Sequence, residues 1–158
     1  MPVFERTVWV DAPFEEVWAF HSRIEGLETL TPSWFHLRVE SVTGPDGTPD
    51  PDELVPGTDI RLSMQPGGVG PRQRWTSRIL EREATEEAAY FTDEMSDGPF
   101  SLWHHTHRFY AEDGGTRIID RVEYRLPLGP FRGLSMAASP VLELMFAARH
   151  RRTKRELE

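Results

Sequence analysis

The sequence predicts one α+β domain over residues 1–158, in which a seven-stranded antiparallel sheet wraps around a long C-terminal helix. Three observations lead to this prediction. Strand-like alternation opens the chain, short strands separated by turn residues fill residues 36–126, and a helical pattern follows residue 139. The length fits a single domain with one core.

The N-terminal segment predicts one strand and two short helices. The strand covers residues 2–10, where β-branched and aromatic side chains recur. A helix follows, for which Asp11 offers an N-cap and Pro13 lies in the first turn. A second helix covers residues 24–30 and ends at Thr31, because the residue before a proline is driven out of the α region.

The middle of the chain predicts an antiparallel meander, because segments rich in Gly, Pro and Asp separate short strand-like runs. The longest of these segments, residues 44–57, is acidic and proline-rich, so we expect a solvated excursion. The six predicted strands are residues 36–43, 58–65, 73–82, 88–95, 101–111 and 116–126.

The dipeptide Asp113-Gly114 predicts a two-residue hairpin between the last two strands and thereby a register. In this register Asp120 lies opposite His107, and His104 points to the other, solvated face of the sheet. One face then collects four facing pairs: Trp103 with Tyr124, His105 with Val122, His107 with Asp120, and Phe109 with Ile118.

The C-terminal helix is predicted to begin near Ser139, with a sheet covering its apolar side. Its apolar stripe comprises Val141, Leu144, Met145 and Ala148, with Leu142 and Phe146 beside it. The last ten residues carry a net charge of +3, so the rest of the chain carries −11.

Composition excludes several classes of protein. A formal net charge of −8 argues against nucleic-acid binding, which needs a basic surface. No apolar run approaches the roughly 20 residues that span a bilayer. The absence of cysteine excludes disulfides, thiolate metal sites and cysteine nucleophiles, and no secretion signal is recognisable, so we expect a cytoplasmic protein.

Four segments together with the order of elements resemble the START-like (SRPBCC) superfamily, in particular its branch of polyketide cyclase/dehydrase, coenzyme Q-binding-like and lipid-transport domains. These segments are VWVDAPFEEVWAF, FTDEMSDGPFSLWHHTHRF, GTRIIDRVEYRLPLG and MFAARHRRTKREL. The resemblance covers nearly the whole chain and implies a helix-grip fold with a cavity between the sheet and the C-terminal helix. It does not choose a function, because the superfamily holds enzymes, carriers and receptors.

The alternation of each strand predicts which side chains line that cavity. A mostly apolar wall with a few polar groups is typical of a site for a small hydrophobic ligand. The alternative is that the large apolar residues simply form the core. The predicted ligand-binding residues are Trp75, Ser77, Phe91, Asp93, Trp103, Phe109, Val122, Tyr124 and Met145.

His105 and His107 project in parallel from one strand into the predicted cavity, and Asp120 is placed to orient His107. Three roles remain open for them. They could transfer protons, with Asp120 as the third catalytic residue; they could bind a metal with a carboxylate; or they could form a structural polar network. We favour the network and predict no metal site. His21 is expected at the surface or at the cavity rim.

The leading functional hypothesis is a module that binds a hydrophobic or aromatic small molecule such as a lipid, a quinone or a polyketide. The first alternative is an enzyme similar to polyketide cyclases or dehydrases, in which Tyr124 or Trp103 positions the substrate. The second is an interaction protein with a vestigial cavity. No nucleotide-binding motif is present, so we expect no cofactor.

The basic C-terminus allows two interpretations, since cations near the end of a helix complement its dipole and also attract anionic lipid headgroups. The residues that would contact such a membrane transiently are Arg149, Arg151, Arg152, Lys154 and Arg155.

Overall fold

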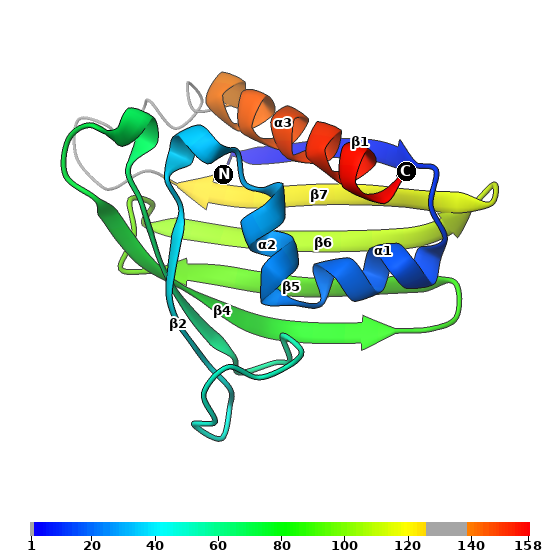
Figure 1. Cartoon of the computed structure of the whole chain (residues 1–158), viewed down its shortest axis with the longest axis horizontal. Coiled ribbons are helices and arrows are strands. Elements are labelled where there is room, and N and C mark those ends of the chain that lie inside the picture. The colour runs from blue at the N-terminus through cyan, green and yellow to red at the C-terminus, as the bar shows by residue number, and fades with distance from the viewer. Residues whose placement is uncertain (1, 126–138) are drawn as a thin grey trace.

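The computed structural model describes residues 2–125 and 139–158, which form one antiparallel sheet with helices on one of its faces (Figure 1). The strands lie in the order β1-β7-β6-β5-β4-β3-β2, so a meander of six strands is closed by the first strand beside the last. This arrangement confirms the predicted fold class. The elements are β1 (Val3–Val10), α1 (Phe14–His21), α2 (Ile24–Leu30), η1 (Ser33–Phe35), β2 (Arg38–Thr43), β3 (Asp59–Met64), η2 (Pro66–Gly68), β4 (Gln73–Ala84), β5 (Ala88–Ser96), β6 (Leu102–Glu112), β7 (Gly115–Arg125) and α3 (Ser139–Leu157).

The β6–β7 hairpin has the predicted register. Asp113 and Gly114 both adopt positive φ angles, 51° and 78°, as a two-residue type I′ turn requires. Trp103 pairs with Tyr124 and His107 with Asp120 across the two strands. The placement of His105, His107 and Asp120 on the concave face therefore depends on a turn that the sequence itself specifies.

The first helix begins later than predicted, and Asp11 is not its N-cap. α1 starts at Phe14, and Pro13 in an extended conformation precedes it without a capping side chain. Thr116 of β7 donates a hydrogen bond of 2.9 Å to the carbonyl of Ala12, which holds the connection against the sheet and delays the helix. The second helix ends before Thr31, as predicted.

Two loop predictions also need correction. The strand predicted from residue 36 begins at Arg38, because η1 precedes it and His36 takes a left-handed conformation with φ 50°. The acidic segment 44–57 is not solvated throughout: Leu54 is buried, and its N–H donates to the carbonyl of Ser22. Residue 126, the end of the last predicted strand, lies outside the described residues.

The helix α3 is rotated relative to the predicted apolar stripe. Val141 and Leu144 are exposed, whereas Leu142, Phe146 and His150 are buried. The buried residues recur at intervals of four and pack on Phe4 of β1 and on β7, so α3 crosses the sheet at its β1–β7 side (Figure 1). Among the described residues, no helix is long and apolar enough to cross a membrane.

Candidate functional site

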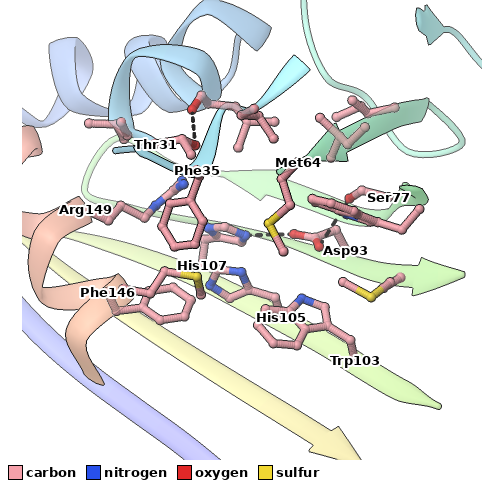
Figure 2. A pocket seen from close by; sticks show the side chains of 18 of the residues that line it. Thr31, Phe35, Met64, Ser77, Asp93, Trp103, His105, His107, Phe146 and Arg149 are labelled. Carbon is pink, nitrogen blue, oxygen red and sulfur yellow. Dashed lines mark hydrogen bonds and ion pairs between the residues drawn. The ribbon is translucent and has the colours of Figure 1, made fainter. Parts of the chain in front are cut away.

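A cavity of about 290 Å³ lies between strands β3 to β6 and helix α3, with α2 and η1 closing one side (Figure 2). Its volume is at the low end of the range of about 300–1,000 Å³ that is typical of small-molecule sites. Most of the wall is apolar, including Phe35, Leu62, Met64, Trp75, Trp103 and Met145. A polar strip formed by Asp93, His105 and His107 runs across the sheet side, and Arg149 faces it from α3.

Six of the nine predicted ligand-binding residues line this cavity: Trp75, Ser77, Phe91, Asp93, Trp103 and Met145. The other three lie on the predicted face but under helices. Phe109 is fully buried against Trp18 of α1, at 5.3 Å between ring centroids. Val122 and Tyr124 are buried in the cluster beneath α3. The helices thus cover β7 and one end of β6, and the cavity is confined to the remaining concave surface.

Asp120 lies between two histidines from different elements. Its Oδ1 accepts a hydrogen bond of 2.7 Å from Nε2 of His105, and its Oδ2 accepts one of 2.5 Å from Nε2 of His150 on α3. All three side chains are at least nine-tenths buried. The carboxylate therefore fastens the C-terminal helix to the wall of the cavity.

His107 has a different carboxylate partner from the one the register predicted. Its Nε2 donates to Oδ2 of Asp93 at 2.8 Å, whereas its Nδ1 is 3.4 Å from Oδ1 of Asp120. Asp120 therefore holds the diagonal neighbour His105 more closely than the directly opposed His107. In a twisted sheet, diagonal pairs come within reach of long side chains. Asp93 also accepts a hydrogen bond of 3.3 Å from Ser77.

Stacking fixes the orientation of these rings. His105 stacks on His107 with centroids 3.5 Å apart, and His107 stacks on Phe91 at 3.9 Å. We call Asp93, His105, His107, Asp120 and His150 the histidine–aspartate cluster.

Burial and hydrogen bonding determine the charges in the cluster. Burial, followed by the neighbouring His105, lowers the pKa of His107 from its usual 6.5 to about 4, so this imidazole is neutral at neutral pH. Burial raises the pKa of Asp120, but the hydrogen bonds from His105 and His150 outweigh this and hold it well below the usual value. Burial also raises the pKa of Asp93, but the hydrogen bond from His107 and the positive charges of the histidines and Arg149 together outweigh it and lower this pKa.

The ligand atoms of Asp93, His105 and His107 all lie within 4.8 Å of one another, a spacing that could hold a metal ion. In both histidines Nε2 is engaged by a carboxylate. A cation bound through Nε2 of either histidine would displace one of these hydrogen bonds. The three residues therefore meet the distance requirement of a metal site and also form a hydrogen-bonded network.

Three polar groups of this region were not predicted to belong to the cavity wall or the cluster: His21, His150 and Arg149. His21, expected at the surface or at the cavity rim, is buried and lines the cavity, and its Nδ1 donates to the carbonyl of Val17 at 2.8 Å. Burial, with the positive charge of Arg149 as the second cause, lowers its pKa to about 3. The signal for His150 was present, since it continues the four-residue spacing of Leu142 and Phe146.

Three of the five basic residues predicted to contact a membrane face the interior of the protein or bond to it. Arg149 lines the cavity, Arg152 donates to the carbonyl of Thr29, and Lys154 donates to the carbonyl of Trp9. Arg151 and Arg155 are the exposed cations that remain among the five candidates.

The model of the family described as "Polyketide cyclase / dehydrase and lipid transport" matches residues 10–152, which include the cavity and the whole histidine–aspartate cluster. The chain belongs to this family. The resemblance found in the sequence is thereby confirmed. The family's description indicates hydrophobic ligands in general and does not select one ligand. A search of curated proteins gave no significant match.

Solved structures share the fold of this family member at low sequence identity. TTHA0849 from Thermus thermophilus is 20% identical, with a TM-score of 0.63 over 99% of this chain and 100% of its own. CV1439 from Chromobacterium violaceum is 16% identical, with a TM-score of 0.69 over 99% and 96% of the two chains. Ms6760 from Mycobacterium smegmatis is also 16% identical, with a TM-score of 0.68 over 99% and 90%. At these identities the likeness concerns the fold alone.

Proposed function

We propose that this protein binds a hydrophobic or aromatic small molecule in the cavity between the sheet and α3. The observation that carries the proposal is the cavity itself, whose apolar wall is interrupted by a few fixed polar groups. Apolar surface gives affinity through its removal from water, and the polar groups orient the ligand. Membership of a family that includes lipid transport supports the same class of ligand.

Three methionines and two tryptophans make the wall suitable for a flat or flexible apolar molecule. Met64, Met95 and Met145 can adjust their side chains to the shape of a ligand, while Trp75 and Trp103 offer broad apolar surfaces. The same wall offers no nucleotide-binding motif and only one cation, Arg149, among the described residues. These features favour a small apolar ligand over a nucleotide.

Filling the cavity tests this proposal. Ser77 of β4 points into the cavity, and its neighbour Thr76 lies on the opposite face of the same strand. We expect Ser77→Phe to weaken binding of the uncharged dye N-phenylnaphthylamine at least tenfold, and Thr76→Phe to leave it unchanged, in a fluorescence titration. Mass spectrometry of ligands extracted from the purified protein identifies the natural class. Equal binding by both variants, or no binding by the unmodified protein, would contradict the proposal.

A second candidate function is acid/base catalysis similar to that of polyketide cyclases and dehydrases, with His105, His107 and Asp120 as the catalytic residues. The observation that favours it is the hydrogen-bonded series His105–Asp120–His150, in which a carboxylate orients an imidazole on the cavity wall. His105 would carry the proton through Nδ1, the ring nitrogen that Asp120 does not engage. His107, with its pKa lowered to about 4, would be a weak base and would serve to orient the substrate.

Replacement of the cavity histidine His105 separates binding from catalysis. His105→Gln should abolish turnover of a substrate identified by extraction and leave its affinity within a few-fold. His104→Gln, on the outer face of the same strand, is the matched control. Turnover that survives His105→Gln would exclude the acid/base assignment, while dye binding by that variant would show that the cavity is intact.

A further inference from the structure

Arg149 is the one cationic side chain that lines the cavity among the described residues, and it has no hydrogen-bond or ion-pair partner there. It projects from α3 toward the polar strip (Figure 2). Burial lowers its pKa below the usual value, and the charges of Asp120 and Asp93 oppose this only partly. A guanidinium has five N–H donors, and leaving them unpaired in an apolar cavity is unfavourable.

The nearby carboxylates do not fill this need. Asp93 is occupied by His107 and Ser77, and both oxygens of Asp120 accept hydrogen bonds from histidines. His21, the other basic group near Arg149, is neutral at neutral pH because its pKa is about 3. The unpaired cationic donors of the cavity therefore belong to Arg149, whereas the nearby carboxylates already accept hydrogen bonds from other residues.

We propose that the bound molecule is a carboxylic acid whose carboxylate pairs with Arg149 while its apolar body lies against Trp75, Trp103 and Met145. This inference rests on the proposed binding function and adds the chemical class of the ligand. A planar guanidinium fits a carboxylate through two parallel hydrogen bonds, and such charge-assisted bonds are stronger than neutral ones. The apolar body is either an aliphatic chain or an aromatic ring system.

The test compares each acid with the alcohol of the same shape. Decanoic acid with decanol represents the aliphatic class, and naphthoic acid with naphthalenemethanol the aromatic class. Each compound displaces N-phenylnaphthylamine at pH 7 from the unmodified protein and from Arg149→Met, Arg149→Lys and the control Arg151→Met. Arg151 is the exposed neighbour on the same helix.

We expect the ratio of acid affinity to alcohol affinity to fall about ten- to a hundredfold in Arg149→Met, which corresponds to the loss of a charged hydrogen bond. The ratio should be unchanged in Arg151→Met and partly retained in Arg149→Lys. If only decanoic acid and decanol show this fall, the ligand is aliphatic; if only naphthoic acid and naphthalenemethanol show it, the ligand is aromatic. If Arg149→Met loses the dye as well, Arg149→Gln replaces it in the comparison.

Three outcomes would overturn the inference. The ratio could be the same in Arg149→Met as in the unmodified protein, or it could fall equally in Arg151→Met. The unmodified protein could also bind the dye and both alcohols but neither acid, which would leave the proposed binding function intact. Failure of the unmodified protein to bind the dye is a different result, because it would overturn the proposed function and this inference together.

Discussion

Arg149 and His150 are consecutive residues of α3, yet they meet the interior of the protein in different ways. His150 donates to Asp120 and thereby joins the helix to the sheet through a buried carboxylate. Arg149 enters the cavity and has no partner among the described residues. His150 therefore completes a hydrogen-bonded network within the chain, whereas the charge of Arg149 faces the cavity.

This difference separates two uses of buried polarity. A polar group with partners inside the chain helps to define the fold, because removing one partner leaves the other unsatisfied. A cation that faces a cavity without such a partner is unfavourable for the fold alone and suits a bound molecule that supplies the missing acceptor. The histidine–aspartate cluster is of the first kind, and Arg149 is of the second.

The largest effect is expected from removing the centre of the cluster. Asp120→Ala should lower the free energy of unfolding by about 3–5 kcal/mol, because His105 and His150 lose their common acceptor in a buried region. Urea denaturation measures this. Glu123→Ala on the same strand, which removes a half-exposed ion pair with Arg121, should cost no more than about 1 kcal/mol. If both variants lose the same free energy of unfolding, the hydrogen bonds of Asp120 do not contribute more to stability than a half-exposed ion pair.

The next largest effect is a loss of folding stability at acid pH. The pKa of His107 is lowered from 6.5 to about 4, so the unfolded chain binds a proton in this range and the folded protein does not. Stability from this group is complete above pH 6.5 and is lost as the pH falls to about 4, up to a total of about 3 kcal/mol. His21, with a pKa of about 3, acts in the same direction, whereas the lowered pKa values of Asp93 and Asp120 act below pH 4.

His107→Gln isolates this contribution. Unfolding free energies of the variant, measured between pH 7 and pH 4, should depend less steeply on pH than those of the unmodified protein, by about one proton. His104→Gln, on the outer face of β6, should keep the original slope. A slope that stays the same in His107→Gln would mean that folding does not lower the pKa of this imidazole.

The sequence predicted the positions of the cluster on the sheet because local chemistry specifies them. Asp113-Gly114 favours a single type of hairpin turn, and the turn sets the face on which His105, His107 and Asp120 lie. The seven strands and the two short helices follow in the same way from alternation, from prolines and from glycine-rich turns. Deviations at Asp11 and Leu54 arise where tertiary contacts override a local preference.

The partners within the cluster could not be predicted, because they depend on sheet twist and on the rotation of α3. Twist brings His105 closer to Asp120 than the opposed His107. Rotation of α3 buries His150 and turns Arg149 toward the cavity, whereas Val141 and Leu144 suggested another buried side. No local sequence pattern determines which side of a helix faces a sheet whose strands are distant in the sequence.

The smallest effect on stability is expected at Arg149 and gives the sharpest contrast within α3. Arg149→Met removes an unpartnered charge and keeps an extended side chain, so the free energy of unfolding should stay unchanged or rise by up to about 1 kcal/mol. Arg152→Met, one turn further along, removes the hydrogen bond to the carbonyl of Thr29 and should cost about 1 kcal/mol. Both values come from urea denaturation without ligand. A loss in Arg149→Met that exceeds the loss in Arg152→Met would mean that the arginine stabilises the empty fold, and the contrast with His150 would disappear.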